Sequence, residues 1–119
     1  MSKKEFEERI SACYPYVRDI YMRYEPVFSE DLISLSWYPG WNHIVEGMLR
    51  TIERDNRNRK KKTSVVQIKS HFCSLYVHYY SSDLGYDKLM NSADLACQQS
   101  CRACGYLINL GDVYCDQCG

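Results

Sequence analysis

Four cysteines near the end of the sequence form two pairs of the pattern Cys-x-x-Cys, and a glycine follows each pair. They are Cys101, Cys104, Cys115 and Cys118. Two residues between paired thiolates let the chain bend so that both sulfurs meet one metal ion, and the glycine permits the positive φ that turns backbone N–H groups toward sulfur. Four thiolates in a tetrahedron suit Zn²⁺ first and iron second. The spacing predicts one structural Zn²⁺ per chain.

The alternative interpretation of these cysteines is a disulfide or a redox pair, but two pairs in one short stretch favour a metal. Four thiolates leave the ion no open position for water or substrate, which argues against hydrolytic catalysis there. Cys97 precedes the first pair by four residues, and we interpret it as a buried apolar residue rather than a further ligand. Zinc binding is worth about 10–16 kcal/mol in such peptides, enough to order a short tail with little core.

The spacer between the two pairs is long enough for a small hairpin. We expect residues 106–108 to run out, 109–112 to turn and 113–114 to return. Residues 100–119 would then form a zinc-ribbon-like module that packs on a first domain of residues 1–99.

Three stretches of that first domain have the spacing of amphipathic helices. Residues 3–24 form the first, with a break at Tyr14-Pro15 because proline cannot continue a helix. The second begins near Trp41 with Asn42 as its cap, and Gly47 within it predicts a close neighbour, since glycine in a helix otherwise costs about 1 kcal/mol. Residues 83–99 form the third and lead into the cysteine module. Residues 27–40 look irregular.

Two β-prone segments, residues 65–68 and 75–80, predict a hairpin. Alternation along the second segment places Tyr76, His78 and Tyr80 on one face and the aliphatic residues on the other. The fold class is therefore α+β: a small, mainly helical domain with a short β-hairpin and a C-terminal zinc-ribbon-like module.

The charge balance, the lengths of the apolar stretches and the cysteine count restrict the classes of function that the chain could have. The chain has 119 residues, with 15 basic and 15 acidic side chains, so no net field favours nucleic acid or a membrane. No apolar stretch is long enough to span a bilayer. An odd count of 7 cysteines, no signal peptide and a metal tetrad predict a reducing cytosol.

Catalytic motifs are missing from the sequence. It has no His-Glu-x-x-His, no phosphate-binding glycine loop and no dinucleotide fingerprint. The only reactive-looking set is Cys73 near His71 and His78, and strand alternation disperses such neighbours over both faces. We therefore expect a protein that is not an enzyme.

Two groups of residues are candidate contacts for a macromolecular partner. The first group is aromatic and suits a protein surface: Trp37, Tyr38, Trp41, Tyr76, His78 and Tyr80. Its alternative is ordinary core packing. The second is basic and suits phosphates: Arg57, Arg59, Lys60, Lys61 and Lys62. Its alternative is a solvated loop.

The order of several motifs resembles a family of small uncharacterised proteins of bacteriophages and prophages. The matching residues are Tyr14-Pro15, Gly40-Trp41, Ile52-Glu53, Ile68-Lys69, Phe72, Leu75, Ser92-Ala93 and the four cysteines of the two pairs. The chain departs from the family at Cys73-Ser74, where the family has Gly-Gly. This resemblance implies a phage origin and action in the host cytosol, and it implies no activity.

These observations lead to a first hypothesis of a zinc-stabilised protein-binding module. It would inhibit or modulate a host complex for defence or nucleic-acid processing, as an anti-CRISPR or anti-restriction factor does. The alternative is a nucleic-acid-binding accessory or regulatory factor that uses residues 57–62 and the Tyr-rich strand. A third possibility is a homodimer formed through exposed aromatic residues.

Overall fold

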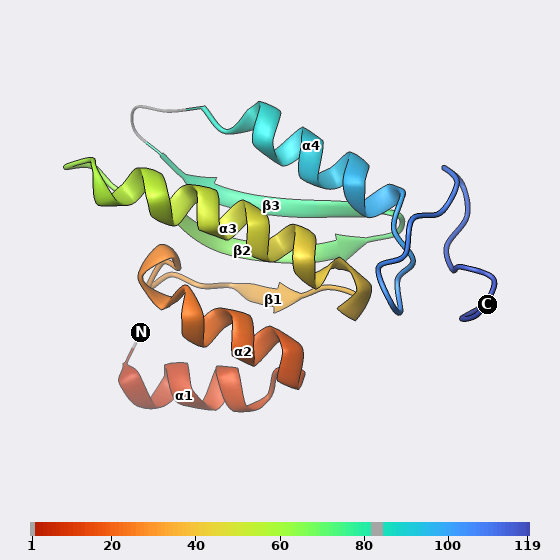
Figure 1. Cartoon of the computed structure of the whole chain (residues 1–119). Helices are drawn as coiled ribbons and strands as arrows, with labels where there is room; N and C mark the ends of the chain where they lie inside the picture. The colour runs from red at the N-terminus through yellow and green to blue at the C-terminus, as the bar shows by residue number, and fades with distance from the viewer. Residues whose placement is uncertain (1, 82–84) are drawn as a thin grey trace.

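The computed structural model describes residues 2–81 and 85–119, and over these residues it has an α+β fold (Figure 1). The helices are α1 (Lys3–Ser11), α2 (Pro15–Arg23), α3 (Asn42–Arg57) and α4 (Asp87–Gln98), with short 3-10 turns at η1 (Glu25–Val27) and η2 (Pro39–Trp41). The strands are β1 (Ser34–Ser36), β2 (Ser64–His71) and β3 (Ser74–Tyr80). The predicted α+β class is confirmed. The expected third helix also covered residues 83 and 84, which lie outside the described part of the chain.

The break between the first two helices falls where proline predicted it. Tyr14 has extended backbone (φ −60°, ψ 148°), and Pro15 is the first residue of α2. Proline suits that position because its missing N–H would have no partner in the first turn of a helix. Val17, Ile20 and Tyr21 then face the core.

The sheet has the order β1-β2-β3. β1 runs parallel to β2, with Leu35 opposite Ile68, and α3 is the crossover between them. β2 and β3 form the predicted antiparallel hairpin, in which Lys69 lies opposite Tyr76. The expectation of irregular backbone before residue 40 was wrong for β1, since only Leu35 of its three residues is apolar and so short a strand has no periodicity to detect.

Helices α3 and α4 lie side by side over one face of the sheet, and α2 lies beside α3 near β1 (Figure 1). The core forms between these layers. Val45, Leu49 and Ile52 of α3 are fully buried, as are Val65 and Ile68 of β2. The opposite face of the sheet carries polar side chains, including Ser36, Lys69 and Tyr76.

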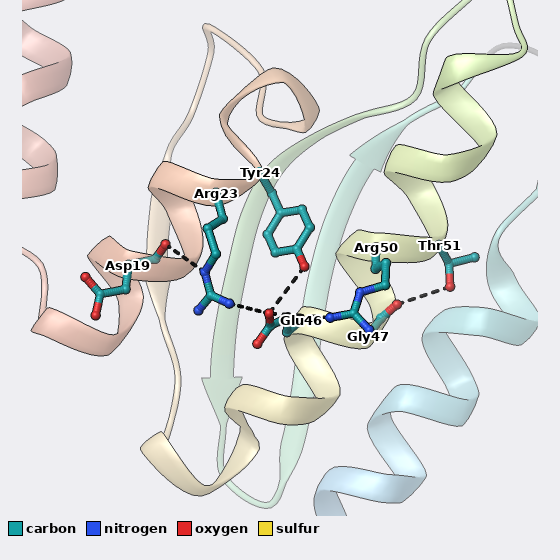
Figure 2. A network of polar contacts seen from close by, with 7 residues as sticks. All are labelled: Asp19, Arg23, Tyr24, Glu46, Gly47, Arg50 and Thr51. Atoms are coloured by element: carbon teal, nitrogen blue, oxygen red, sulfur yellow. Dashed lines mark hydrogen bonds and ion pairs between the residues drawn. The ribbon is translucent and has the colours of Figure 1, made fainter.

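Helix α3 is also held to α2 by polar contacts at its outer side. The Glu46 carboxylate accepts hydrogen bonds from Arg23 and from the Tyr24 hydroxyl, the latter at 3.3 Å (Figure 2). Arg50 adds an ion pair with Glu46 at 3.7 Å. Both arginines are largely exposed, so these contacts orient the helices while burial of the apolar side chains supplies most of the stability.

Two expectations about α3 were wrong. Asn42 is the first helical residue rather than the cap, and its side-chain oxygen accepts a hydrogen bond from Trp37 Nε1 at 2.8 Å. Gly47 has no close neighbour, because a Cβ built there would meet nothing within 4 Å. The glycine that does meet other backbone is Gly40, just before α3.

β3 is one of the two edge strands of the sheet. Its first residues follow a turn at Phe72 and Cys73, and Phe72 has a positive φ of 54°. The Leu75 N–H points to α4, where Asp94 Oδ1 accepts it at 2.9 Å. None of the helices in the described residues has the length and apolar character needed to cross a membrane.

Candidate metal centre

The four paired cysteines come together after α4. Their sulfur atoms all lie within 4.8 Å of one another, and the Cys104 and Cys115 sulfurs are 3.6 Å apart. All are free thiols. Zn–S bonds of about 2.3 Å in a tetrahedron separate the sulfurs by about 3.8 Å, so a small contraction would complete a Cys₄ site. The donor set thus fits one thiolate-bound metal ion.

Each cysteine pair sits in a tight turn closed by the glycine that follows it. Gly105 N–H donates to Cys101 C=O, and Gly119 N–H donates to Cys115 C=O, both at 2.9 Å. Gly105 has the predicted positive φ, at 82°. Gly119 lies outside the left-handed region, so the prediction of a positive φ holds for the first pair alone.

The spacer between the pairs differs from the expected hairpin. Residues 106–108 pair with residues 99–101, through Cys101 N–H to Tyr106 C=O (2.8 Å) and Ile108 N–H to Gln99 C=O (2.9 Å). The chain that leaves α4 is extended and offers these groups at once, whereas Val113 reaches back only to Arg102 N–H. The turn was placed correctly, since Asp112 N–H donates to Asn109 C=O and Gly111 has a φ of 99°.

Backbone of η2 meets backbone of the first cysteine turn directly. Gly40 N–H donates to Arg102 C=O at 2.8 Å. A Cβ on Gly40 would lie 2.0 Å from Cys101 O, and one on Gly105 would lie 2.7 Å from Gly40 O. Both glycines are therefore needed for the two segments to touch. Gly40 ended the stretch that was expected to be irregular, and this contact was not predicted; the one available signal was a glycine between Pro39 and Trp41.

Arg102, between the first two cysteines, connects three distant segments. Its Nη2 donates to Phe72 C=O at 3.0 Å and contacts Cys73 Sγ at 3.3 Å, and its guanidinium lies 4.5 Å from the centroid of the Tyr38 ring. No sequence signal predicts this role, since it depends on how the hairpin and η2 meet in space.

The protonation states of the thiols favour a first metal contact at Cys101. Burial raises the pKa of Cys101, but hydrogen bonds from the backbone of Cys115, Cys104 and Ala103 outweigh it and lower that pKa to about 6. Hydrogen bonding with Cys115 and Cys104 raises the pKa of Cys118 to about 12. At neutral pH Cys101 is therefore the readier thiolate of these two, and metal binding must displace the proton of Cys118.

Cys97 belongs to the core and not to this cluster. Its side chain is buried with the apolar residues of α4, and that burial raises its pKa to about 12. The packing interpretation is confirmed.

The aromatic candidates for partner contact divide into two sets. Trp37 and Trp41 are at most 2% exposed and serve the core, so they offer a partner no surface. Tyr38 is half-buried beneath Arg102. Tyr76 and Tyr80 are exposed on the outer face of β3, as alternation predicted, with half-buried His78 between them.

Two of the basic residues in the stretch 57–62 contact neighbouring residues of the protein. Arg57 pairs with Glu53 at 2.7 Å, and Lys62 Nζ donates to Asn56 C=O near the end of α3. Buried Asn56 closes the loop by bonding Thr63 C=O and N–H, each at 2.9 Å. Arg59 is half-buried, whereas Lys60 and Lys61 are exposed.

The three side chains that looked reactive in the sequence, Cys73, His71 and His78, each make a separate contact. Cys73 contacts Arg102, the His71 ring packs on Phe72, and the His78 ring packs on Tyr80.

An exposed apolar surface on the spacer was not predicted, because those residues were assigned to a self-paired hairpin. Tyr106, Leu107 and Leu110 expose between 64% and 74% of their surfaces, and Tyr114 exposes 47%. The three most exposed side chains lie within five positions of one another, beside the cysteine cluster.

In comparisons with known proteins, no family model, curated protein or solved structure matches the chain.

Proposed function

We propose that this chain is a zinc-stabilised protein-binding module. One observation carries the proposal: the segment held by the four cysteines presents Tyr106, Leu107 and Leu110 to solvent. Such exposed clusters mark contact surfaces, because leaving apolar area in water costs about 25 cal/mol per Å². A Cys₄ site closed to substrate assigns the metal a structural role.

Zinc is the ion we propose for the cluster. Four thiolates without a disulfide suit Zn²⁺, which takes four-coordinate tetrahedral sites and has no redox chemistry of its own. When bound, the ion would hold the two cysteine turns together.

We further propose that the partner is a host protein in the cytosol of an infected cell, within a complex for defence or nucleic-acid processing. The resemblance to small phage proteins supports this origin. Inhibition by occupying such a complex requires a contact surface and no catalytic group.

The test is affinity purification of the tagged chain from host cells with nuclease treatment. Metal analysis and mass spectrometry of the eluate would follow. We expect one Zn²⁺ per chain and a stoichiometric host protein that survives nuclease. The Leu107→Ser/Leu110→Ser variant should keep its zinc and lose the protein. Retention of the same partner by that variant would refute the proposed surface.

A second candidate function is nucleic-acid binding, and the outer face of the sheet favours it. Tyr76, His78 and Tyr80 lie along β3, and Lys69 Nζ sits 5.3 Å from the centroid of the Tyr76 ring. Aromatic rings beside a cation can stack bases and contact phosphate. We expect single-stranded DNA or RNA to bind this face with an affinity that falls steeply with salt.

The matched variants for this candidate are Tyr76→Ala and Lys60→Ala/Lys61→Ala. The first should weaken binding at every salt concentration, and the second should flatten the salt dependence. Absence of binding at low salt would eliminate this candidate and leave the protein-binding proposal untouched.

A further inference from the structure

The spacer of the metal module is hollowed as well as apolar. A cleft of about 410 Å³ is lined by Tyr106, Leu107, Leu110, Asp112, Tyr114 and Asp116, among other residues of the module. This volume falls within the range of about 300–1,000 Å³ that is usual for ligand pockets. Apolar and polar side chains thus share the lining of a space large enough for side chains of a partner. We call it the tail cleft.

The charge at the tail cleft has one sign. Asp112 and Asp116 are the only charged side chains between residues 103 and 119, a stretch without Lys, Arg or His. Arg102, the nearest basic residue in sequence, directs its guanidinium to the hairpin turn and the Tyr38 ring. Four thiolates around a divalent ion would add a further formal charge of −2 beside the cleft.

A lining that combines exposed apolar side chains with two carboxylates selects its ligand by both properties. An apolar side chain gains by leaving water, and flanking cations gain by approaching the carboxylates. The carboxylates repel phosphate. Nucleic acid is therefore expected on the outer face of the sheet and not in this cleft. An acidic peptide would meet like charges and bind poorly.

We infer that the tail cleft binds a segment of a partner protein in which an apolar side chain is flanked by Lys or Arg. This inference rests on the proposed protein-binding function and specifies its ligand. Cys104 and Cys115 are the ligands that bracket the spacer, so metal binding fixes both ends of the chain that forms the cleft.

The experiment measures fluorescence anisotropy of labelled short peptides with the full, zinc-loaded chain. The probes are a peptide of alternating Lys and Leu, one of alternating Glu and Leu, and one of alternating Lys and Ser. We expect the Lys–Leu peptide to bind roughly tenfold more tightly than either of the others. Its affinity should fall with salt, and single-stranded DNA should not compete.

Variants of the tail cleft have matched controls elsewhere on the chain. Asp112→Asn/Asp116→Asn should weaken Lys–Leu binding roughly fivefold, and Leu110→Ser roughly tenfold. Asp31→Asn and Ile33→Ser change an exposed acid and an exposed apolar residue outside the cleft, and should leave the affinity unchanged. Zinc content and circular dichroism verify that each variant is folded.

Contrary results would distinguish failure of the charge preference from failure of the cleft as a binding site. Equal binding of the Lys–Leu and Glu–Leu peptides, with both lost in Leu110→Ser, would overturn the charge preference and keep the protein-binding function. Binding that survives Leu110→Ser, or no binding of any peptide, would overturn the inference about the cleft. Recovery of a host partner by affinity purification would then decide the proposed function separately.

Discussion

Phe72 combines two unfavourable features at one position. Its backbone φ is 54°, in the left-handed region, and its side chain is 80% exposed. A non-glycine residue in that region costs about 1–2 kcal/mol, and an exposed ring recovers little of it by burial. What the position contributes is its carbonyl, which accepts the hydrogen bond from Arg102.

Phe72→Gly should therefore stabilise the protein by about 0.5–1 kcal/mol, because glycine removes the strain at a smaller entropic cost and keeps the carbonyl. Urea unfolding of the metal-loaded chain measures the change. Cys73→Gly is the control, since Cys73 has no positive φ, and it should give no gain. A loss of stability in Phe72→Gly would show that the ring itself contributes.

Among the single residues, the four clustered cysteines were predictable because their spacing is itself the signal. Arg102 and Asn56 were not, since each acts on partners that only the folded chain brings near. Arg102 reaches a hairpin turn 30 positions away in sequence. Asn56 is a buried polar residue whose partners lie across a loop.

At the scale of the elements, replacing either of two glycines in or beside α3 by alanine should change stability in opposite directions. Gly47→Ala should stabilise the protein by about 1 kcal/mol, because alanine is the better helix former and a Cβ there meets open space. Gly40→Ala should cost at least about 2 kcal/mol and weaken metal binding, because η2 must then move away from the first cysteine turn. Thermal unfolding and zinc titration test the pair. Equal effects at both positions would contradict the close backbone contact at Gly40.

A partly buried hydrogen bond with a pH dependence joins α3 to the residue that precedes α4. The Tyr86 hydroxyl donates to Asp55 Oδ2 at 2.8 Å. Burial, and next this bond, raise the pKa of Tyr86 above its ordinary value of 10.0. Above pH 10 the unfolded chain loses this proton while the folded chain keeps it, so the free energy of unfolding falls as the pH rises.

Tyr86→Phe should cost about 1 kcal/mol at neutral pH, because Asp55 loses its donor. Its stability should also decline less steeply than that of the wild type above pH 10. Denaturant unfolding at several alkaline pH values measures both effects. Parallel pH profiles for the two proteins would exclude Tyr86 as a source of the decline.

The elements found from sequence are those with a long repeat. The helices and the β2–β3 hairpin each contain several turns or alternations of apolar residues, and all appeared near their expected positions. β1 has a single apolar residue, and the tail pairing depends on backbone groups, which carry no sequence signature. Such features follow from the three-dimensional arrangement and not from local preference.

For the molecule as a whole, the core and the proposed metal site are separate sources of order. Among the described residues, the hydrophobic cluster runs from Ile10 to Cys97 and includes none of the four metal ligands. The tail instead depends on the thiolates, a few backbone hydrogen bonds and its contact with η2.

Removal of the metal with a chelator should therefore disorder residues 99–119 and leave the helices and the sheet folded. Hydrogen exchange is expected to lose protection at Ile108 N–H and to retain it at Leu49 N–H. Cys115→Ser should reproduce this effect, and Cys73→Ser, outside the cluster, should still bind one ion per chain. Cooperative unfolding of the whole chain on chelation would contradict the separation.

Asp94 affects whether copies of the protein can associate through the edge strand β3. An edge strand offers its outward backbone groups to strands of other molecules. By holding the Leu75 N–H, Asp94 places a carboxylate where an incoming strand from a second copy would begin to pair. Pairing would have to displace that contact and bury the charge. A single acidic side chain thus opposes edge-to-edge association of copies of the protein.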